Sequence, residues 1–228
     1  MIEIKNLVKR YGSIYAINGI NLRVEDNSFV GLVGPNGSGK TTLLKLIFGF
    51  LRPSYGEIKV DGEFPGVRLR MKAAFYSEND SVYQWMRVGS LIKWYSSFFL
   101  DWNREKEEEL LDFFKIPSRM YVVHLSKGLK AKLRMLLILS RDAKLFLFDE
   151  PFSGVDPASR EAIAEGILKA YKEGKTFILS THIVRDVETL FERTIFMKEG
   201  NILIDDETDK LREEYGKSVE EIFREIFK

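Results

Sequence analysis

The stretch GPNGSGKTT, residues 34–42, places a glycine-rich loop between the apolar run FVGLV and the helix-like segment LLKLIFGF. Gly34, Gly39, Lys40 and Thr41 match the phosphate-loop pattern, in which two glycines are followed by lysine and then serine or threonine. Glycine permits close backbone approach, and the following helix presents its positive end to an anion. The stretch therefore predicts a strand, a phosphate-holding loop and a helix in direct succession.

Each residue of this loop has an expected role at a phosphate group. The backbone N–H groups of residues 36–41 are expected to point at phosphate oxygens. Lys40 is expected to reach the β- and γ-phosphates, and the Thr41 hydroxyl is expected to ligate Mg²⁺. The candidate binding residues are Gly34, Pro35, Asn36, Gly37, Ser38, Gly39, Lys40, Thr41 and Thr42.

Strand and helix patterns alternate along the rest of the chain. Short strands are predicted at residues 2–7, 20–24, 56–60, 145–149, 176–180, 194–198 and 201–204. The strands at 145–149 and 176–180 are apolar throughout, as strands buried on both faces tend to be, and a helical pattern at 157–173 lies between them. These three segments predict a parallel crossover unit.

The length of 228 residues favours one domain, residues 1–228, with one subdomain. Residues 79–140 contain no convincing strand and are predicted to form an inserted helical subdomain. Residues 205–228 are predicted to form a C-terminal helical tail, with Ser218 and Glu221 spaced as a capping box. This tail is expected to pack on its own domain, with a dimer contact as the alternative.

Acidic and histidine side chains follow the two most apolar strands. Asp149 is expected to hold Mg²⁺, and Glu150, one residue later, is expected to polarise an attacking water. His182 follows the strand TFILS and is expected at the same sheet edge. Two adjacent acids often only cap a strand, and a lone histidine is usually an ordinary residue. The position of all three beside the predicted phosphate loop favours the functional interpretation.

Composition excludes several classes of protein. Thirty-five Lys and Arg balance thirty-four Asp and Glu, and the formal net charge of +1 offers no global attraction for nucleic acid or an anionic membrane. Without cysteine there is no disulfide or thiolate metal site. No apolar run approaches the roughly 20 residues of a membrane helix, and no leader precedes the first predicted strand. We expect a cytoplasmic protein without a nucleic-acid partner.

The ordered motifs resemble those of the nucleotide-binding subunits of ATP-binding cassette (ABC) transporters over essentially the whole chain. They are KRYGS, GPNGSGKTT, YSEND, LSKGLK, LFLFDEP, SGVD and STH. The resemblance implies an α/β P-loop NTPase with a mainly parallel core sheet, an N-terminal antiparallel β subdomain and an inserted helical subdomain. It also implies ATP and Mg²⁺ as cofactors and hydrolysis of ATP to ADP and phosphate.

The resemblance also assigns roles to residues outside the phosphate loop. Tyr11 would stack on adenine, Glu150 would be the catalytic base, and Lys40 and His182 would contact the γ-phosphate. Ser126 and Gly128 would bind the ATP held by a second subunit, and Asp156 would communicate across the dimer. The implied assembly is a homodimer, or a heterodimer with another cassette, that holds two ATP molecules.

Three further features resemble export-type systems whose membrane-spanning permease is a separate chain. They are the stretch DEPFSGVDP, the DWN motif before an acidic helix and the variant signature LSKGLK. That resemblance implies a peripheral position on the inner face of the cell membrane. A soluble ABC-type ATPase acting on nucleic acid or in assembly is the alternative, and a nucleotide switch or kinase is a distant third.

Two departures from the family pattern affect the site. Lys127 and Leu129 replace a glycine and a glutamine of the usual signature; Lys127 would either add charge at the opposing phosphate or project to solvent. Glu78 occupies the position of a metal-contacting glutamine, so that Thr41, Asp149 and Glu78 are the candidate metal ligands. The alternative is that Glu78 is only a solvated acid in this loop.

Three tryptophans, Trp85, Trp94 and Trp102, either pack a helical core or mark a partner surface.

Overall fold

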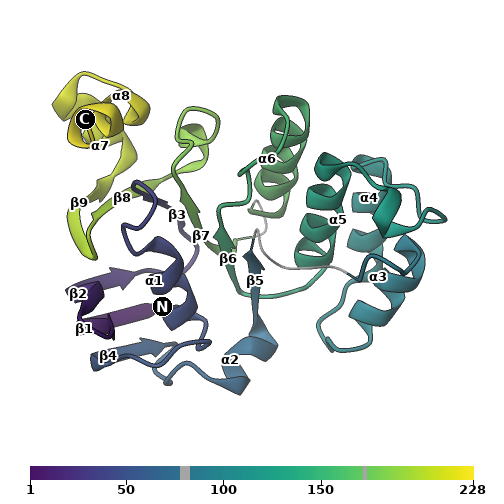
Figure 1. Cartoon of the computed structure of the whole chain (residues 1–228), viewed down its shortest axis with the longest axis horizontal. Coiled ribbons are helices and arrows are strands. Elements are labelled where there is room, and N and C mark those ends of the chain that lie inside the picture. Colours follow the sequence, from purple (N-terminus) through teal and green to yellow (C-terminus); the bar gives the residue numbers. More distant parts are fainter. Residues whose placement is uncertain (78–82, 172–173) are drawn as a thin grey trace.

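The computed structural model describes residues 1–77, 83–171 and 174–228 (Figure 1). Its N-terminal part is an antiparallel sheet with strand order β2-β1-β4. The strands are β1 (Ile2–Tyr11), β2 (Ile14–Val24) and β4 (Tyr55–Val60). Alternate residues such as Ile2 and Ile4 are buried, so that one face of this sheet packs on the rest of the chain.

The central sheet has the strand order β5-β6-β7-β3-β8-β9. Its first five strands are parallel, and β9 forms an antiparallel pair with β8. The strands are β3 (Phe29–Val33), β5 (Ala73–Ser77), β6 (Leu145–Asp149), β7 (Thr176–Thr181), β8 (Arg193–Lys198) and β9 (Asn201–Glu207). This arrangement confirms the predicted fold class.

Helices cover both faces of this sheet, because alternate residues of its strands belong to two different hydrophobic clusters. Phe146 and Phe148 of β6 pack in one cluster, which takes in α5 (Lys127–Leu139) and α6 (Pro157–Tyr171). Leu145 and Leu147 pack in the other, with α1 (Lys40–Ile47) and the N-terminal sheet. The two-sided burial explains the unbroken apolar sequence of β6.

Three longer helices lie between β5 and β6 in the sequence and form a group at the right of Figure 1. They are α3 (Val88–Ser96), α4 (Arg104–Phe113) and α5. No strand occurs among the described residues 83–144. This helical group supports the subdomain predicted at 79–140, of which residues 79–82 lie outside the described part of the chain.

The chain ends in α7 (Thr208–Tyr215) and α8 (Val219–Ile226). The Ser218–Glu221 capping box is present, and Val219 and Ile222 are fully buried, so that both the predicted cap and the packing of this helix on its own domain are confirmed. β9 runs to Glu207, and the helical part of the tail therefore begins three residues later than the predicted boundary at 205.

Several predicted boundaries were wrong. β1 and β2 are longer than predicted, and the short helix α2 (Val67–Lys72) and the strand β5 were not predicted at all. β5, with the sequence AAFYS, has no alternation and no β-branched residue, so that only its place beside β6 makes it a strand. None of the described helices is long and apolar enough to cross a membrane.

Candidate nucleotide-binding site

The phosphate loop lines a recess of about 330 Å³ at the end of β3. Tyr11 and Ala16 of the N-terminal sheet and Glu150 after β6 complete its walls. The loop residues on the recess are Asn36, Gly37, Ser38, Gly39, Lys40, Thr41 and Thr42. Tyr11, which is predicted from the sequence to stack on adenine, is half exposed, and the Lys9 ammonium lies 5.2 Å from the centre of its ring.

Two glycines of the loop are required by close backbone contacts. A Cβ atom on Gly34 would lie 2.4 Å from the carbonyl oxygen of Met197. Gly39 has a φ angle of +106°, and a Cβ atom there would lie 2.4 Å from the carbonyl oxygen of Ala16. The loop therefore passes between β8 and β2 along a path that only glycine permits at these positions.

Lys40 begins α1 and is buried beneath the loop. Its ammonium group donates hydrogen bonds to the carbonyl oxygens of Gly34 at 2.7 Å and Pro35 at 3.1 Å, and it lies 3.3 Å from Oε1 of Glu150. Burial lowers the pKa of Lys40 below its ordinary value, while the charge of Glu150 opposes that shift. The loop thus holds a cation whose hydration has been removed and which favours contact with anionic oxygen.

Thr41 and Asp149 form the hydroxyl–carboxylate pair expected of a magnesium site. The Thr41 hydroxyl donates to Oδ1 of Asp149 at 2.8 Å, and the Ser180 hydroxyl donates to the same oxygen at 2.9 Å. Hydroxyl and carboxylate oxygens are the hard donors that Mg²⁺ prefers, so that these residues fit the ion. The third predicted ligand, Glu78, lies outside the described residues.

Glu150 and His182 are joined directly. Oε2 of Glu150 lies 2.8 Å from Nδ1 of His182 and accepts from the His182 backbone N–H at 3.3 Å. The backbone N–H of Glu150 in turn donates to the Ser180 carbonyl oxygen at 3.1 Å. Glu150 has a φ angle of +49°, which turns its side chain away from that of Asp149. The two adjacent acids therefore face different partners.

The sequence did not single out Ser180 or Ala16. Ser180 bonds both Asp149 and the backbone of Glu150, and it orients the two acids from the neighbouring strand β7. Its place directly before Thr181 and His182 in the STH motif is the signal that could have identified it. Ala16 contributes through its backbone, for which the sequence carries no signal.

Ser126, Gly128 and Asp156 are absent from the lining of the recess. Ser126 is exposed and caps α5, since its hydroxyl accepts from the Leu129 N–H at 3.2 Å. Asp156 is exposed and caps α6, where Oδ1 accepts from the Ser159 N–H at 2.9 Å. A Cβ atom on Gly128 would lie 2.5 Å from Oδ2 of Asp156. The three residues thus form a second group, which joins the ends of two helices.

Comparison with known proteins identifies the family. The family model described as "ABC transporter" matches residues 17–153, more than half of the chain. "Nod factor export ATP-binding protein I" of Rhizobium johnstonii is 33% identical over 93% of this chain and 71% of its own length. "Uncharacterized ABC transporter ATP-binding protein YhaQ" of Bacillus subtilis is 28% identical over 95% of this chain and 74% of its own length.

Solved structures give the same result for the fold. A structure described as the ATP binding subunit of an ABC transporter matches with a TM-score of 0.85 and 25% identity over 99% of this chain and 98% of its own. The dimeric cassette MJ0796, bound to ADP and phosphate, matches with a TM-score of 0.80 and 23% identity over 91% of this chain and 98% of its own. The chain belongs to the ABC transporter family and is one of its ATP-binding, ATP-hydrolysing subunits.

Proposed function

We propose that this chain powers export through a membrane permease by closing as a dimer around two ATP molecules. The observation that carries the proposal is that two groups of predicted ATP-binding residues lie apart in one chain: those that line the recess, and the group of Ser126, Gly128 and Asp156. The phosphate loop, Glu150 and His182 line one site, whereas the exposed Ser126 at the start of α5 lies outside it. A second copy that applies its α5 N-terminus to the first copy's phosphate loop would complete each site.

The residues of the recess divide the chemistry among them. Lys40 and the loop N–H groups would hold the terminal phosphates, and Thr41 with Asp149 would hold Mg²⁺, which neutralises phosphate charge when bound. Glu150 would accept the proton of the attacking water. His182, hydrogen-bonded to Glu150, would fix that carboxylate and face the γ-phosphate. Tyr11 would bind the adenine ring.

The ATP-dependent mass of Glu150→Gln, measured by light scattering, tests the dimer. This variant should bind ATP without consuming it, and its mass should double with ATP and remain that of the monomer with ADP. A variant that also carries Ser126→Arg should stay monomeric, because the added side chain stands at the proposed interface. An unchanged mass of Glu150→Gln under saturating ATP would overturn the homodimer.

An aromatic surface of the helical group supports the proposed permease contact. The exposed side chains are those of Trp85, Tyr83, Trp94 and Phe98, and each ring contacts the next in this order. The ring centroids are 6.1, 4.9 and 4.7 Å apart. Exposed apolar surface of this kind is typical of a protein contact. Trp102, by contrast, packs against the core, as expected of a structural residue.

Recruitment to membranes tests this contact. Wild-type chain added to inside-out membrane vesicles from its own source organism should sediment with them, because the inner membrane face, where the permease contact is expected, lies on their outside. Trp85→Ser should stay in the supernatant, although its ATP-dependent dimerisation is unchanged. Equal sedimentation of Trp85→Ser and wild-type chain would contradict the assignment of this surface.

The export direction is proposed from the relatives named for Nod factor export.

A further inference from the structure

Three lysines stand in register at the start of three neighbouring parallel strands. Lys72, Lys144 and Lys175 immediately precede β5, β6 and β7. Ala73 pairs with Leu145, and Leu145 pairs with Thr176, so that the preceding lysines form a row across the sheet. Backbone hydrogen bonds continue through this row, from Lys144 N–H to the Lys72 carbonyl and from Thr176 N–H to the Lys144 carbonyl, each 3.0 Å.

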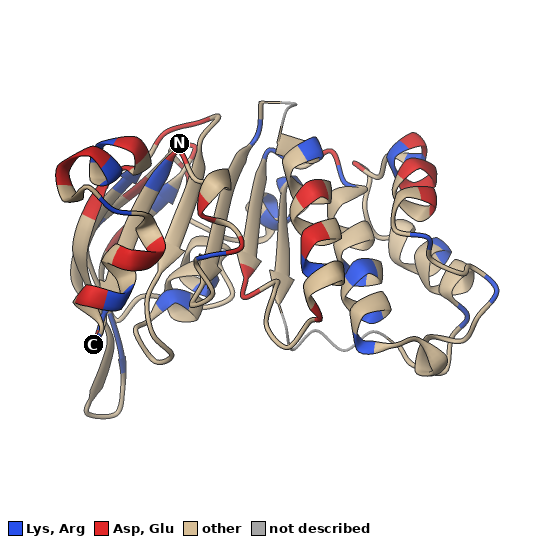
Figure 2. Cartoon of the chain, turned by 90° about the horizontal axis from the view of Figure 1, so that it is seen from above, with Lys and Arg blue, Asp and Glu red and all other residues tan. Residues whose placement is uncertain are grey.

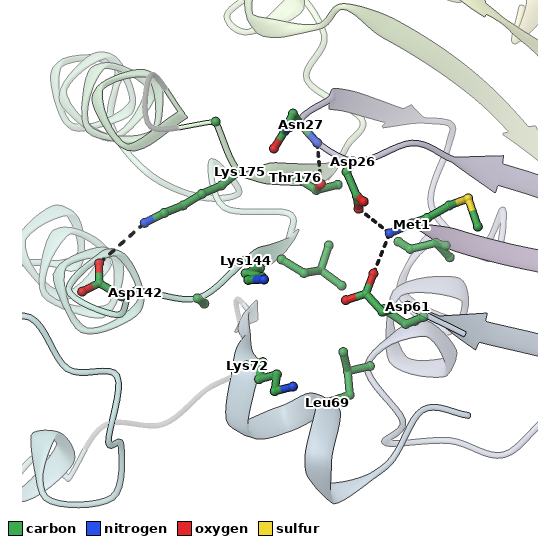
Figure 3. Close-up of a pocket in the computed structure, with 15 residues that line it drawn as sticks. Met1, Asp26, Asn27, Asp61, Leu69, Lys72, Asp142, Lys144, Lys175 and Thr176 are labelled. Carbon is green, nitrogen blue, oxygen red and sulfur yellow. Dashed lines mark hydrogen bonds and ion pairs between the residues drawn. The ribbon is translucent and has the colours of Figure 1, made fainter. Parts of the chain in front are cut away.

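A cavity of about 480 Å³ opens beside this lysine row (Figure 3). Lys72, Lys144 and Lys175 line it together with Met1, Asp26 and Asp61. The cavity lies at the amino ends of β6 and β7, whereas Asp149 and Thr181 mark the carboxyl ends, where the nucleotide site is. The lysine row is therefore remote from the ATP chemistry, and that chemistry does not explain it.

The acidic groups of the cavity already have partners. Asp26 and Asp61 both accept hydrogen bonds from the Met1 amino group. Asp142 accepts from the Lys106 ammonium at 2.8 Å and lies 3.8 Å from that of Lys175. Figure 3 shows the acidic pair Asp26 and Asp61 on the side of the cavity away from Asp142. Asp142 is thus paired with Lys106 and with Lys175 of the row, whereas Asp26 and Asp61 share the one amino group of Met1.

Lys72 and Lys144 have no ion-pair partner within residues 1–77, 83–171 and 174–228, and both are exposed to the cavity. Neighbouring strands are about 4.8 Å apart, and like charges placed in register on them repel. The backbone register keeps the Cα atoms of Lys72 and Lys144 close together, and an anion bound by both ammonium groups would relieve the repulsion between them. The cavity lining carries the Met1 amino group and three lysines against three carboxylates, and its excess positive charge attracts counter-ions.

We propose that the lysine row and its cavity form a second anion-binding site, for a small soluble molecule that carries a diphosphate or two phosphate groups. Lysine ammonium groups bind phosphate as point charges without requiring one orientation. Two of them on adjacent strands match the spread of charge along a diphosphate. The cavity volume lies within the range of small-molecule sites, which leaves room for the rest of such a ligand.

Titration with inorganic pyrophosphate tests the site. Binding is measured by calorimetry in magnesium-free buffer that contains enough ADP to fill the phosphate loop. Wild-type chain should show saturable binding, and Lys72→Ala/Lys144→Ala should bind at least tenfold more weakly. The matched control is Lys5→Ala/Lys93→Ala, which removes two exposed lysines elsewhere and should bind as wild type does. Circular dichroism establishes that each variant is folded, and Lys144→Gln replaces the double variant should that one fail to fold.

Absence of saturable binding to wild-type chain would overturn the proposal, as would equal affinities in the two double variants. Vesicles of phosphatidylcholine with and without phosphatidate distinguish a soluble ligand from a lipid headgroup. The proposal expects pyrophosphate binding and no sedimentation with phosphatidate vesicles that depends on Lys72 and Lys144. Lysine-dependent sedimentation without pyrophosphate binding would assign the site to a lipid and overturn the soluble ligand.

Discussion

The ammonium group of Lys40 lies 3.3 Å from Oε1 of Glu150, and both side chains are largely buried, with 5% and 14% of their surface exposed. The pair connects the residue that is expected to hold phosphate with the residue that is expected to activate water. Glu150 also contacts His182 through its other oxygen. Each of its two carboxylate oxygens therefore has a separate partner, and a change at Glu150 affects both binding and chemistry.

Glu150→Gln should lower ATP hydrolysis at least about 100-fold, because general-base catalysis contributes about 10²–10⁴ in rate. ATP affinity should be kept or improved, since Lys40 loses a competing negative charge. Phosphate release and equilibrium binding of ATP measure the two effects. Glu161→Gln, which changes an exposed carboxylate on α6, serves as the control and should hydrolyse ATP as wild type does. Activity of Glu150→Gln within tenfold of wild type would contradict the assigned base.

His182→Ala should lose nearly as much activity as Glu150→Gln, because the 2.8 Å contact makes the two side chains one unit. Residues that act together lose activity non-additively, so that the double variant should be little slower than either single variant. Hydrolysis rates of the four proteins in this cycle measure the coupling. Multiplied effects of the two changes would show that His182 acts independently of Glu150.

Gly128→Ala should destabilise the chain by about 1–3 kcal/mol, because overpacking of a filled site costs that much. The added Cβ atom would lie 2.3 Å from the Ser159 hydroxyl and 2.5 Å from Oδ2 of Asp156. Urea unfolding provides the measurement. Gly89→Ala is the matched control, since the nearest atom to its Cβ is the Ser118 carbonyl oxygen at an ordinary 3.4 Å. Equal stability of the two variants would disprove the close packing around Gly128.

Local sequence predicted the phosphate loop, the two acids and the cap of α8, since each depends on neighbouring residues. Tertiary relationships were not predictable in the same way. The DWN motif at 101–103 carried no structural meaning in the sequence, yet Asp101 holds the fully buried Arg141 through two hydrogen bonds of 3.1 and 3.0 Å. Arg141 also donates to the Ala73 carbonyl oxygen at 2.6 Å. These contacts connect segments 40 and 68 residues apart, which no local pattern encodes.

The sequence predicted only that the numbers of positive and negative side chains balance, and it did not predict where they lie. Figure 2 shows Lys and Arg interspersed with Asp and Glu over most elements, in agreement with the near-zero net charge. The lysine row was invisible in the sequence, because Lys72, Lys144 and Lys175 become neighbours only when β5, β6 and β7 pair in register. The row also requires β5 to lie in the sheet, and the sequence did not predict this strand.

Lys127→Gly should leave ATP turnover within a few-fold of wild type. Lys127 is the exposed first residue of α5, and its side chain makes no ion pair among the described residues. Ser126, the residue with the capping hydroxyl, is unchanged in this variant. Phosphate release at saturating ATP measures the turnover. A loss approaching 100-fold, about 2.7 kcal/mol of barrier, would instead assign the Lys127 charge to the ATP of the partner subunit.

Asp142→Asn should reduce the dependence of stability on acid. Burial raises the pKa of Asp142, but hydrogen bonds from Lys106 and Asn103 outweigh it and hold this pKa below its ordinary 3.8. The unfolded chain therefore binds this proton at a higher pH than the native chain does. The stabilisation is present above 3.8 and is lost as the pH falls through the lowered native pKa.

Asparagine removes this charge at every pH, so that the variant should unfold more easily at pH 7 and approach the wild type below about pH 3. The expected difference at pH 7 is below about 1 kcal/mol, since Asp142 is half exposed and its ion pairs are screened by water. Urea unfolding at both pH values measures it, with the more exposed Asp209→Asn as control. A native pKa that these contacts displace must appear as a difference in proton uptake on unfolding. If the free energy of unfolding depends on pH identically in Asp142→Asn and wild-type chain, the contacts with Lys106 and Asn103 therefore contribute no net stability.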